Sequence, residues 1–195
     1  KELPSHIPNN VDEGLLKNDL INLAQYLSEE TINLQVDETK SLEESVIAEV
    51  AFQVPEVSNT VMSYVVEQLD GVVIEQNALF SFLDEITLME SMKNIDEELS
   101  FIATALYQLI LHTEMEPIER QTDDVIPEYS DAGLDVKIDL KKQIDLKFYN
   151  LKDFTFTINS ELSRDQLTMT LSTAKDPIIY EVKQGHIIQV PARTI

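Results

Sequence analysis

The chain of 195 residues contains no cysteine and no apolar run long enough to cross a membrane. The first absence excludes disulfide bonds, thiolate metal sites and cysteine nucleophiles. The second excludes a transmembrane helix within this sequence, because a span needs roughly 18 or more consecutive apolar residues. The first residues also lack the basic segment and apolar stretch of a secretory signal. Since the chain begins at Lys1 rather than Met, we expect that a signal sequence or membrane anchor has been removed.

Basic residues are scarce, with 14 Lys and Arg against 36 Asp and Glu, so the formal net charge is −22. A field of that sign repels phosphate backbones, and we therefore expect neither nucleic-acid binding nor direct binding to anionic lipid. Hydrophobic residues make up 43% of the chain, which is enough to bury a sizeable core.

Changes in composition along the chain predict three parts. Residues 1–45 read as an extended arm followed by a helix, because Leu16, Leu20, Leu23 and Leu27 recur at helical spacing. Residues 46–175 hold the main domain. Residues 176–195 read as a closing hairpin, with strands at 178–182 and 186–190 on either side of Gln184-Gly185.

The first part of the main domain alternates strand and helix signals. Val46 to Val54 is rich in β-branched residues and is closed by Pro55, which predicts a strand. A helix is expected from Ser58 or Asn59 to Gly71, since apolar residues recur every four positions. Two short extended pieces, Val72–Ile74 and Leu79–Phe82, should then flank a turn at Gln76-Asn77.

The strongest helix signal runs from about Ile95 to Met115, where apolar residues follow the i, i+3, i+4, i+7 pattern. Asn94 and Glu97 have the spacing of a capping box, and Pro117 marks the exit. Asp96, Glu97 and Glu98 would lie in the first turn, where the helix dipole favours negative charge.

Beyond Pro127 the pattern changes to strict alternation. Three strands at about ten-residue spacing predict an antiparallel meander with one buried face, centred on Leu146, Phe156 and Met169. The expected fold class is therefore α+β: a single domain with a mainly antiparallel sheet packed by a long central helix, plus an N-terminal helical appendage.

Several short motifs, weak singly, occur in a specific order over residues 55–175. They are Leu69-Asp70-Gly71-Val72-Val73-Ile74, Leu79-Phe80-Ser81-Phe82, Thr104-Ala105-Leu106-Tyr107, Glu119-Arg120, Gly133-Leu134-Asp135 and Ile144-Asp145-Leu146-Lys147-Phe148. As a set they resemble the VanW-like family of Gram-positive bacteria, with its L-N-G-T-V-L, V-F-S-F, S-T-L-Y, E-R, G-x-D and L-D-L-K-F segments. The resemblance implies an extracytoplasmic setting near peptidoglycan, in a secreted or membrane-tethered protein.

The chain departs from the family pattern at its reactive-looking centre. The family has a Gly-Gly-Gly-x-Cys-Gln turn where this sequence reads Asp96-Glu97-Glu98-Leu99-Ser100-Phe101. The His that follows the E-R pair is Gln121, and Pro-Gly before the V-F-S-F strand becomes Gln76-Asn77. If the glycine turn and its Cys carry chemistry, this member should lack it.

Ser100 occupies the Cys position, but a serine nucleophile needs a base within hydrogen-bond reach, and nearby acids would oppose the developing alkoxide. We therefore expect an ordinary polar helix residue and no catalytic site. The family-matching polar residues Glu119, Arg120, Asp135 and Asp145, with Tyr107 as core or cleft lining, are the candidate ligand-binding residues. An ion pair joining helix to sheet is the structural alternative for Arg120, which would otherwise meet a carboxylate.

No cofactor or metal is expected. His6, His112 and His186 lack any ligand spacing, which makes zinc improbable. Calcium is the more plausible ion, with candidate ligands in Asp123-Asp124, Glu128 and Asp131, or in Asp96-Glu97-Glu98, although no D-x-D-x-D-G loop is present. The alternative is a solvated acidic surface.

The sequence thus predicts a non-catalytic extracytoplasmic envelope protein that binds a partner protein or a cell-wall component. Two alternatives stay open: an enzyme acting on peptidoglycan stem peptides, and a calcium-responsive acidic surface protein. The oligomeric state is not indicated.

Overall fold

The computed structural model describes residues 44–54, 59–175 and 179–182. The predicted arm and first helix, before residue 44, lie outside the described residues. From Glu44 onward the chain forms one unit of mixed α and β structure, as the sequence predicted. Its strands belong to two antiparallel sheets.

The larger sheet has four strands in the order β1-β7-β6-β2. They are β1 (Ser45–Gln53), β2 (Val72–Ile74), β6 (Phe156–Leu162) and β7 (Gln166–Thr173), all antiparallel to their neighbours. The predicted alternation is confirmed in β7, where Leu167, Met169 and Leu171 are buried. One face of this sheet therefore belongs to the core.

The smaller sheet has the order β3-β5-β4, with β3 (Leu79–Ser81), β4 (Glu116–Glu119) and β5 (Lys147–Tyr149). The predicted meander is therefore wrong in one respect, because β5 pairs with β3 and β4 and not with β6. Phe80 and Phe148 lie opposite each other in this pairing, and their rings stack at 4.6 Å between centroids. That aromatic pair favours the register observed.

Helices α2 (Asn59–Leu69), α3 (Phe82–Glu85) and α4 (Asp96–Ile110) complete the described elements. Helix α2 is confirmed, and Gly71 just beyond it has φ +78°, a left-handed conformation that glycine adopts without strain. Phe82 begins α3 and does not continue β3, because the Ser81 hydroxyl accepts a hydrogen bond from Asp84 N–H and caps the helix.

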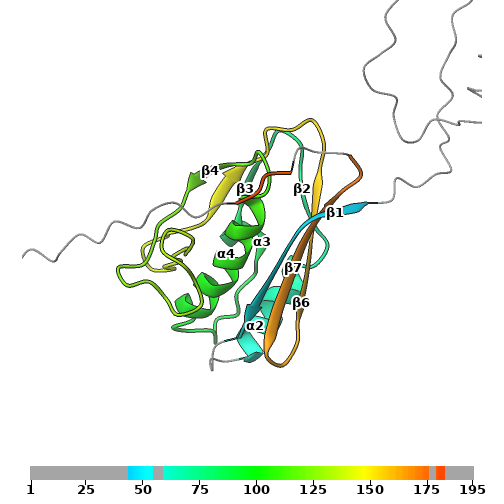
Figure 1. Ribbon diagram of the computed structural model, residues 1–195. Helices are drawn as coiled ribbons and strands as arrows, with labels where there is room; N and C mark the ends of the chain where they lie inside the picture. Colours follow the sequence, from blue (N-terminus) through cyan, green and yellow to red (C-terminus); the bar gives the residue numbers. More distant parts are fainter. Residues whose placement is uncertain (1–43, 55–58, 176–178, 183–195) are drawn as a thin grey trace, which may run out of the picture. The chain divides into compact units, whose positions relative to one another are not determined.

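Helix α4 is the centre of the fold. Nearly all of its side chains are buried, and Figure 1 shows it running beside the long strands β1 and β7. A helix that is apolar on almost every side must be enclosed. Its fully buried residues include Leu99, Ile102, Leu106 and Leu109.

Both predicted ends of α4 need correction. Asn94 is no cap: it has φ +56°, Ile95 takes the N-cap position, and no side chain caps the helix there. The helix ends at Ile110 and not at Met115. The Thr113 hydroxyl donates to Ile110 O at 2.7 Å and accepts from Met115 N–H at 3.1 Å, which turns the chain into β4.

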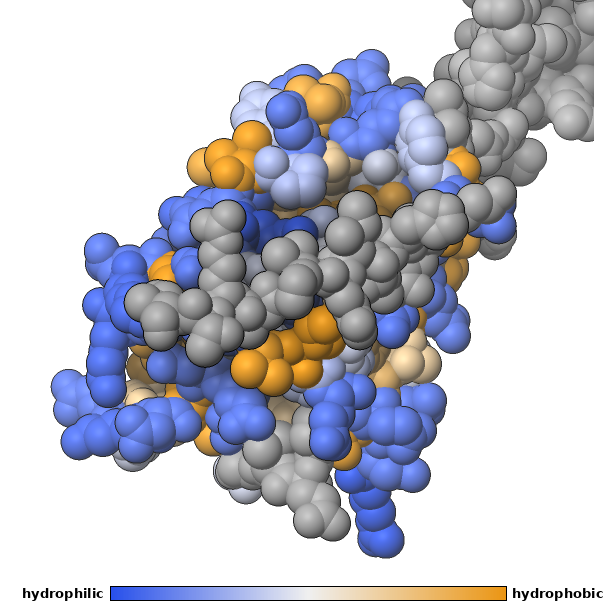
Figure 2. Space-filling model, turned by 60° about the vertical axis from the view of Figure 1, so that its left-hand side comes forward, coloured by the Kyte–Doolittle hydropathy of each residue, from blue (hydrophilic) through white to orange (hydrophobic). Residues whose placement is uncertain are grey.

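The first strand of the predicted closing hairpin is also wrong where it is described. Residues 179–182 form no strand, and Tyr180 N–H donates to His112 O at 3.0 Å. The second strand lies outside the described residues. Within the described part of the chain, no helix is long and apolar enough to span a bilayer. The face seen in Figure 2 is mostly hydrophilic, with hydrophobic side chains in separate patches.

Candidate functional site

A cavity of about 320 Å³ lies at the start of α4, and three of the residues that replace the family's glycine turn and Cys line it: Asp96, Glu97 and Ser100. Its walls come from α4 and from two loops after β4, and its lining residues are Asp96, Glu97, Ser100, Asp123, Pro127, Tyr129, Lys137, Ile138 and Asp139. A cleft thus exists at this position, and the state of the Ser100 hydroxyl decides what it can do.

Both hydrogen-bonding directions of the Ser100 hydroxyl are occupied by main-chain groups. It donates to Asp96 O at 2.6 Å and accepts from Ile138 N–H at 2.9 Å. The residue as a whole is 4% exposed. A nucleophilic serine must give its proton to a base, and here the proton is directed at a carbonyl oxygen of its own helix. The hydroxyl serves as a structural link between α4 and Ile138, a role that the sequence analysis did not assign to it.

Thr104, one helical turn further along, makes the same kind of link. Its hydroxyl accepts from Val136 N–H at 2.9 Å and lies 3.5 Å from Val136 O. Residues four apart lie on one face of a helix, so Ser100 and Thr104 together hold the backbone of residues 136–138 against α4. Sequence analysis missed Thr104, although it belongs to the S-T-L-Y-like motif.

Carboxylates dominate the charge of this cavity. Lys137 Nζ lies 3.2 Å from an Asp123 carboxylate oxygen, and this hydrogen-bonded contact raises the pKa of Lys137. Burial raises the pKa of Tyr129 to about 12, with further contributions from the charges of Asp123 and Glu97. Both shifts favour the protonated forms, so neither group can serve as a base at neutral pH.

Glu119 and Asp145, two candidate ligand-binding residues, meet in one cluster with Lys147. Glu119 accepts from Asp145 N–H at 3.0 Å and from Lys147 Nζ at 2.9 Å. The hydrogen bond from Lys147 is the main reason why the pKa of Glu119 is lowered, and the same bond raises the pKa of Lys147. The cluster joins β4 to β5, which are paired strands.

The Asp145 carboxylate is almost fully buried, with 2% of the residue exposed. It accepts hydrogen bonds from the Ser81 hydroxyl at 2.7 Å, from Leu83 N–H at 3.1 Å and from Leu146 N–H at 2.7 Å. An acceptor of three internal donors has little capacity left for a ligand. Asp145 therefore fastens the start of α3 to the segment just before β5.

Arg120, Tyr107 and Asp135 form a second cluster. The Arg120 guanidinium lies 4.3 Å from the Tyr107 ring centroid and donates to the main-chain oxygens of Gly133 and Asp135 at 2.7–3.1 Å. The structural alternative for Arg120 was an ion pair with an unnamed acidic partner, and no such pair is found within the described residues. The guanidinium bonds main-chain oxygens, and the Asp135 carboxylate accepts from Asp123 N–H at 2.8 Å. Arg120 thus fixes the loop at residues 133–135, where Gly133 has φ +82°.

The candidate residues therefore lie in two clusters, and each side chain is engaged by its own fold. The calcium candidates do not converge either: among the residues described, no group of three or more Asp, Glu or His could hold a metal ion. His112 contacts Tyr180: the His112 Nδ1 atom lies 3.0 Å from the main-chain oxygen of Tyr180. His6 and His186 lie outside the described residues.

Comparison with known proteins agrees with the motif analysis. The model of a family described as "VanW like protein" matches residues 93–172. That span contains α4, β4, β5, β6 and most of β7, together with Ser100 and the two polar clusters. No curated protein matches the chain, and neither does any solved structure.

Proposed function

Because the chain is a member of the VanW-like family through residues 93–172, and that family is associated with the cell envelope, we propose that it is a non-catalytic extracytoplasmic binding protein. Its ligand is a partner protein or a cell-wall component. The negative charge fits this proposal, since net charge far from zero keeps an exported domain soluble.

The observation that carries the proposal is the double engagement of Ser100. The hydroxyl at the family's Cys position accepts from Ile138 N–H and donates to Asp96 O, so its proton is directed at a main-chain oxygen and not at a side-chain base. The family framework around it stays intact, with the motif residues Glu119, Arg120 and Asp145 holding strands and loops together. A framework kept without its nucleophile favours binding over turnover.

Co-sedimentation with purified cell-wall sacculi tests the proposal. The protein should pellet with sacculi and be released by excess soluble wall fragments. If the ligand is a partner protein and not a wall component, the immobilised protein should capture an envelope protein from a membrane extract. Bovine serum albumin, another acidic protein, is the control for non-specific retention. Absence of retention in both assays would contradict the proposal.

An enzyme acting on peptidoglycan stem peptides is the second candidate, and the cavity at the start of α4 favours it. Carboxylates from Asp96, Glu97, Asp123 and Asp139 surround that space and could assist proton transfer. This function predicts amino-acid release from stem peptides, lost in Glu97→Gln, whose side chain is exposed. No release over a prolonged incubation would remove it.

A further inference from the structure

Strand β1 forms one edge of the larger sheet, because the order is β1-β7-β6-β2. In an edge strand, alternate residues direct their N–H and C=O groups away from the sheet, where another strand can pair with them. Among the described residues, no backbone hydrogen bond reaches the outer edge of β1. The strand is nine residues long, which is ample for pairing.

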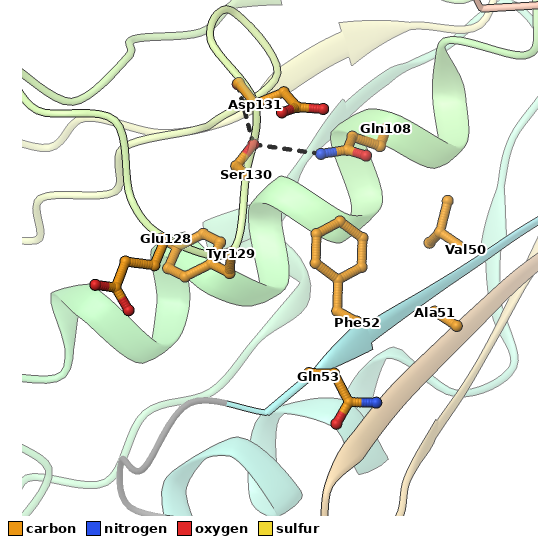
Figure 3. Close-up of a pocket in the computed structure, with 9 residues that line it drawn as sticks. All are labelled: Val50, Ala51, Phe52, Gln53, Gln108, Glu128, Tyr129, Ser130 and Asp131. Atoms are coloured by element: carbon orange, nitrogen blue, oxygen red, sulfur yellow. Dashed lines mark hydrogen bonds between the residues drawn. The ribbon is translucent and has the colours of Figure 1, made fainter.

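A groove runs along the C-terminal half of that edge. It encloses about 500 Å³ and is bordered by Val50–Gln53 on one side and by Glu128–Asp131 on the other, with Gln108 from α4 between them. Figure 3 shows the two walls facing each other across α4. Four strand residues at roughly 3.3 Å each make the wall about 13 Å long, which suits an extended segment of similar length.

Aromatic rings build the base of the groove. Phe52 packs edge-on against Phe101 with ring centroids 5.9 Å apart, and Phe101 packs edge-on against Tyr129 at 5.0 Å. Phe101 is fully buried, whereas Phe52 and Tyr129 keep part of their surface exposed and line the groove. An extended chain lying there could place every second side chain on this apolar surface.

The far wall is held in place by its own hydrogen bonds. Ser130 N–H donates to Pro127 O at 3.1 Å, and the Ser130 hydroxyl donates to Asp131 O at 3.3 Å. Gln108 Nε2 donates to that hydroxyl at 3.4 Å, which ties the loop to α4 (Figure 3). A groove that exists before binding needs little reorganisation when a ligand enters.

The charge of the groove is of one sign. Among the residues that the structure describes, Glu128 and Asp131 are the only charged ones that line the groove, both are exposed, and no basic residue lines it. Glu49, the β1 residue just before the groove, is exposed as well. These carboxylates favour a ligand that carries ammonium or guanidinium groups.

We propose that this groove binds an extended basic segment of a partner polypeptide, which adds to the edge of β1 as a further antiparallel or parallel strand. Main-chain hydrogen bonds to β1 supply affinity, alternate side chains contact Phe52 and Tyr129, and Lys or Arg side chains meet Glu128 and Asp131. A second copy of the chain is a poor occupant, since each copy carries a net charge of −22. The proposal deepens the binding function above and rests on it.

Three synthetic peptides test this directly in calorimetric titrations of the full chain. The probe alternates Lys and Val over six residues, a second peptide replaces Lys by Glu, and a third has the probe sequence with N-methyl groups on alternate residues. Only the first should bind measurably, because the second reverses the charge and the third removes main-chain donors. In NMR spectra of the protein titrated with the probe, the amide cross-peaks of Val50–Gln53 and Glu128–Asp131 should shift most.

Two matched variants separate the charge contribution from general effects. Glu128→Gln with Asp131→Asn should weaken binding of the probe about fivefold, a loss that shrinks at high salt. Glu75→Gln with Asp153→Asn makes the same charge change at two exposed residues outside the groove and should leave affinity unchanged. Equal losses in both pairs would overturn the proposal.

Equal binding of the N-methylated peptide, or chemical shifts confined to another surface, would also overturn it. So would concentration-dependent dimerisation that competes with the probe, because the edge would then belong to a second copy. Retention on sacculi without probe binding would defeat the groove assignment and leave the proposed function standing. Probe binding without retention of the protein on sacculi, and without capture of a partner, would contradict the proposed function and leave the groove assignment standing.

Discussion

Replacing Ser100 by alanine should destabilise the fold, because the hydroxyl is the acceptor for a buried amide. Ile138 is 1% exposed, and its N–H bonds to Ser100 Oγ at 2.9 Å. A buried donor left without an acceptor costs about 1–3 kcal/mol, and alanine returns a few tenths of a kcal/mol in helix propensity. Water entering the adjacent cavity would keep the loss near the lower end.

The expected net loss is therefore about 1–2 kcal/mol in the free energy of unfolding. For a domain of this size each kcal/mol corresponds to roughly 2–4 °C, so the melting temperature should fall by about 2–8 °C. Ser100→Cys, which restores the family residue, should give an intermediate loss since a thiol is a weak acceptor.

Thermal and urea unfolding of the folded chain measure this loss. Ser63→Ala on α2 is the control, because the Ser63 hydroxyl forms no hydrogen bond with any other group that the structure describes. Its stability should stay within about 0.5 kcal/mol of the wild type. If Ser100→Ala melts at the wild-type temperature, the hydroxyl does not hold Ile138 and the structural role assigned to it is wrong.

Glu119 has a lowered pKa in the folded state, so its stabilising effect is present above the unfolded carboxyl pKa of about 4.3 and is lost as the pH falls through the folded value. Glu119→Gln should therefore reduce the fall in melting temperature between about pH 6 and pH 3. An unchanged dependence of the melting temperature on pH would contradict the Lys147 contact. Tyr129 has a pKa of about 12, so the unfolded chain loses its phenol proton first and stability falls as the pH rises beyond about 10. Tyr129→Phe should reduce that alkaline loss and remove an absorbance step near pH 12, whereas a tyrosine spectrum without any late step would disprove the assignment. Arg120→Lys loses the paired contacts with the loop at residues 133–135 and should cost about 1–3 kcal/mol in urea unfolding, while a neutral result would favour a ligand role for Arg120.

Local patterns predicted the elements whose signals are local. The 3.6-residue periodicity located α4, and the two-residue alternation located β6 and β7. The Glu116-Pro117-Ile118-Glu119 segment offered no such alternation, and it becomes β4 because the edge of β5 is available to pair with it. Its register shifts between Pro117 and Glu119, which fits a proline that lacks an N–H donor.

Pairing between distant strands was the main error. The spacing of β5, β6 and β7 favoured a meander, yet the Phe80–Phe148 stack and the Asp145 contacts with Ser81 and Leu83 place β5 in the other sheet. Such contacts join residues more than 60 positions apart, so no window of sequence contains them.

The candidate site was predicted in part. The motif comparison selected Arg120 and Asp135, which do lie together, but it could not show that the guanidinium bonds main-chain oxygens and leaves the carboxylate to another partner. The groove beside β1 left no sequence signal, because Phe52, Tyr129 and Asp131 come from segments that only the fold brings together.

The muropeptide profile of purified sacculi tests the central claim most directly. Sacculi are incubated with the wild-type chain, with Ser100→Ala or with buffer, and the soluble and digested fragments are compared by mass spectrometry. If the chain binds the wall without cleaving it and Ser100 has a structural role only, the fragment profile should be the same in all three samples. New fragments with the wild type that disappear in Ser100→Ala, provided that the variant is still folded, would contradict it.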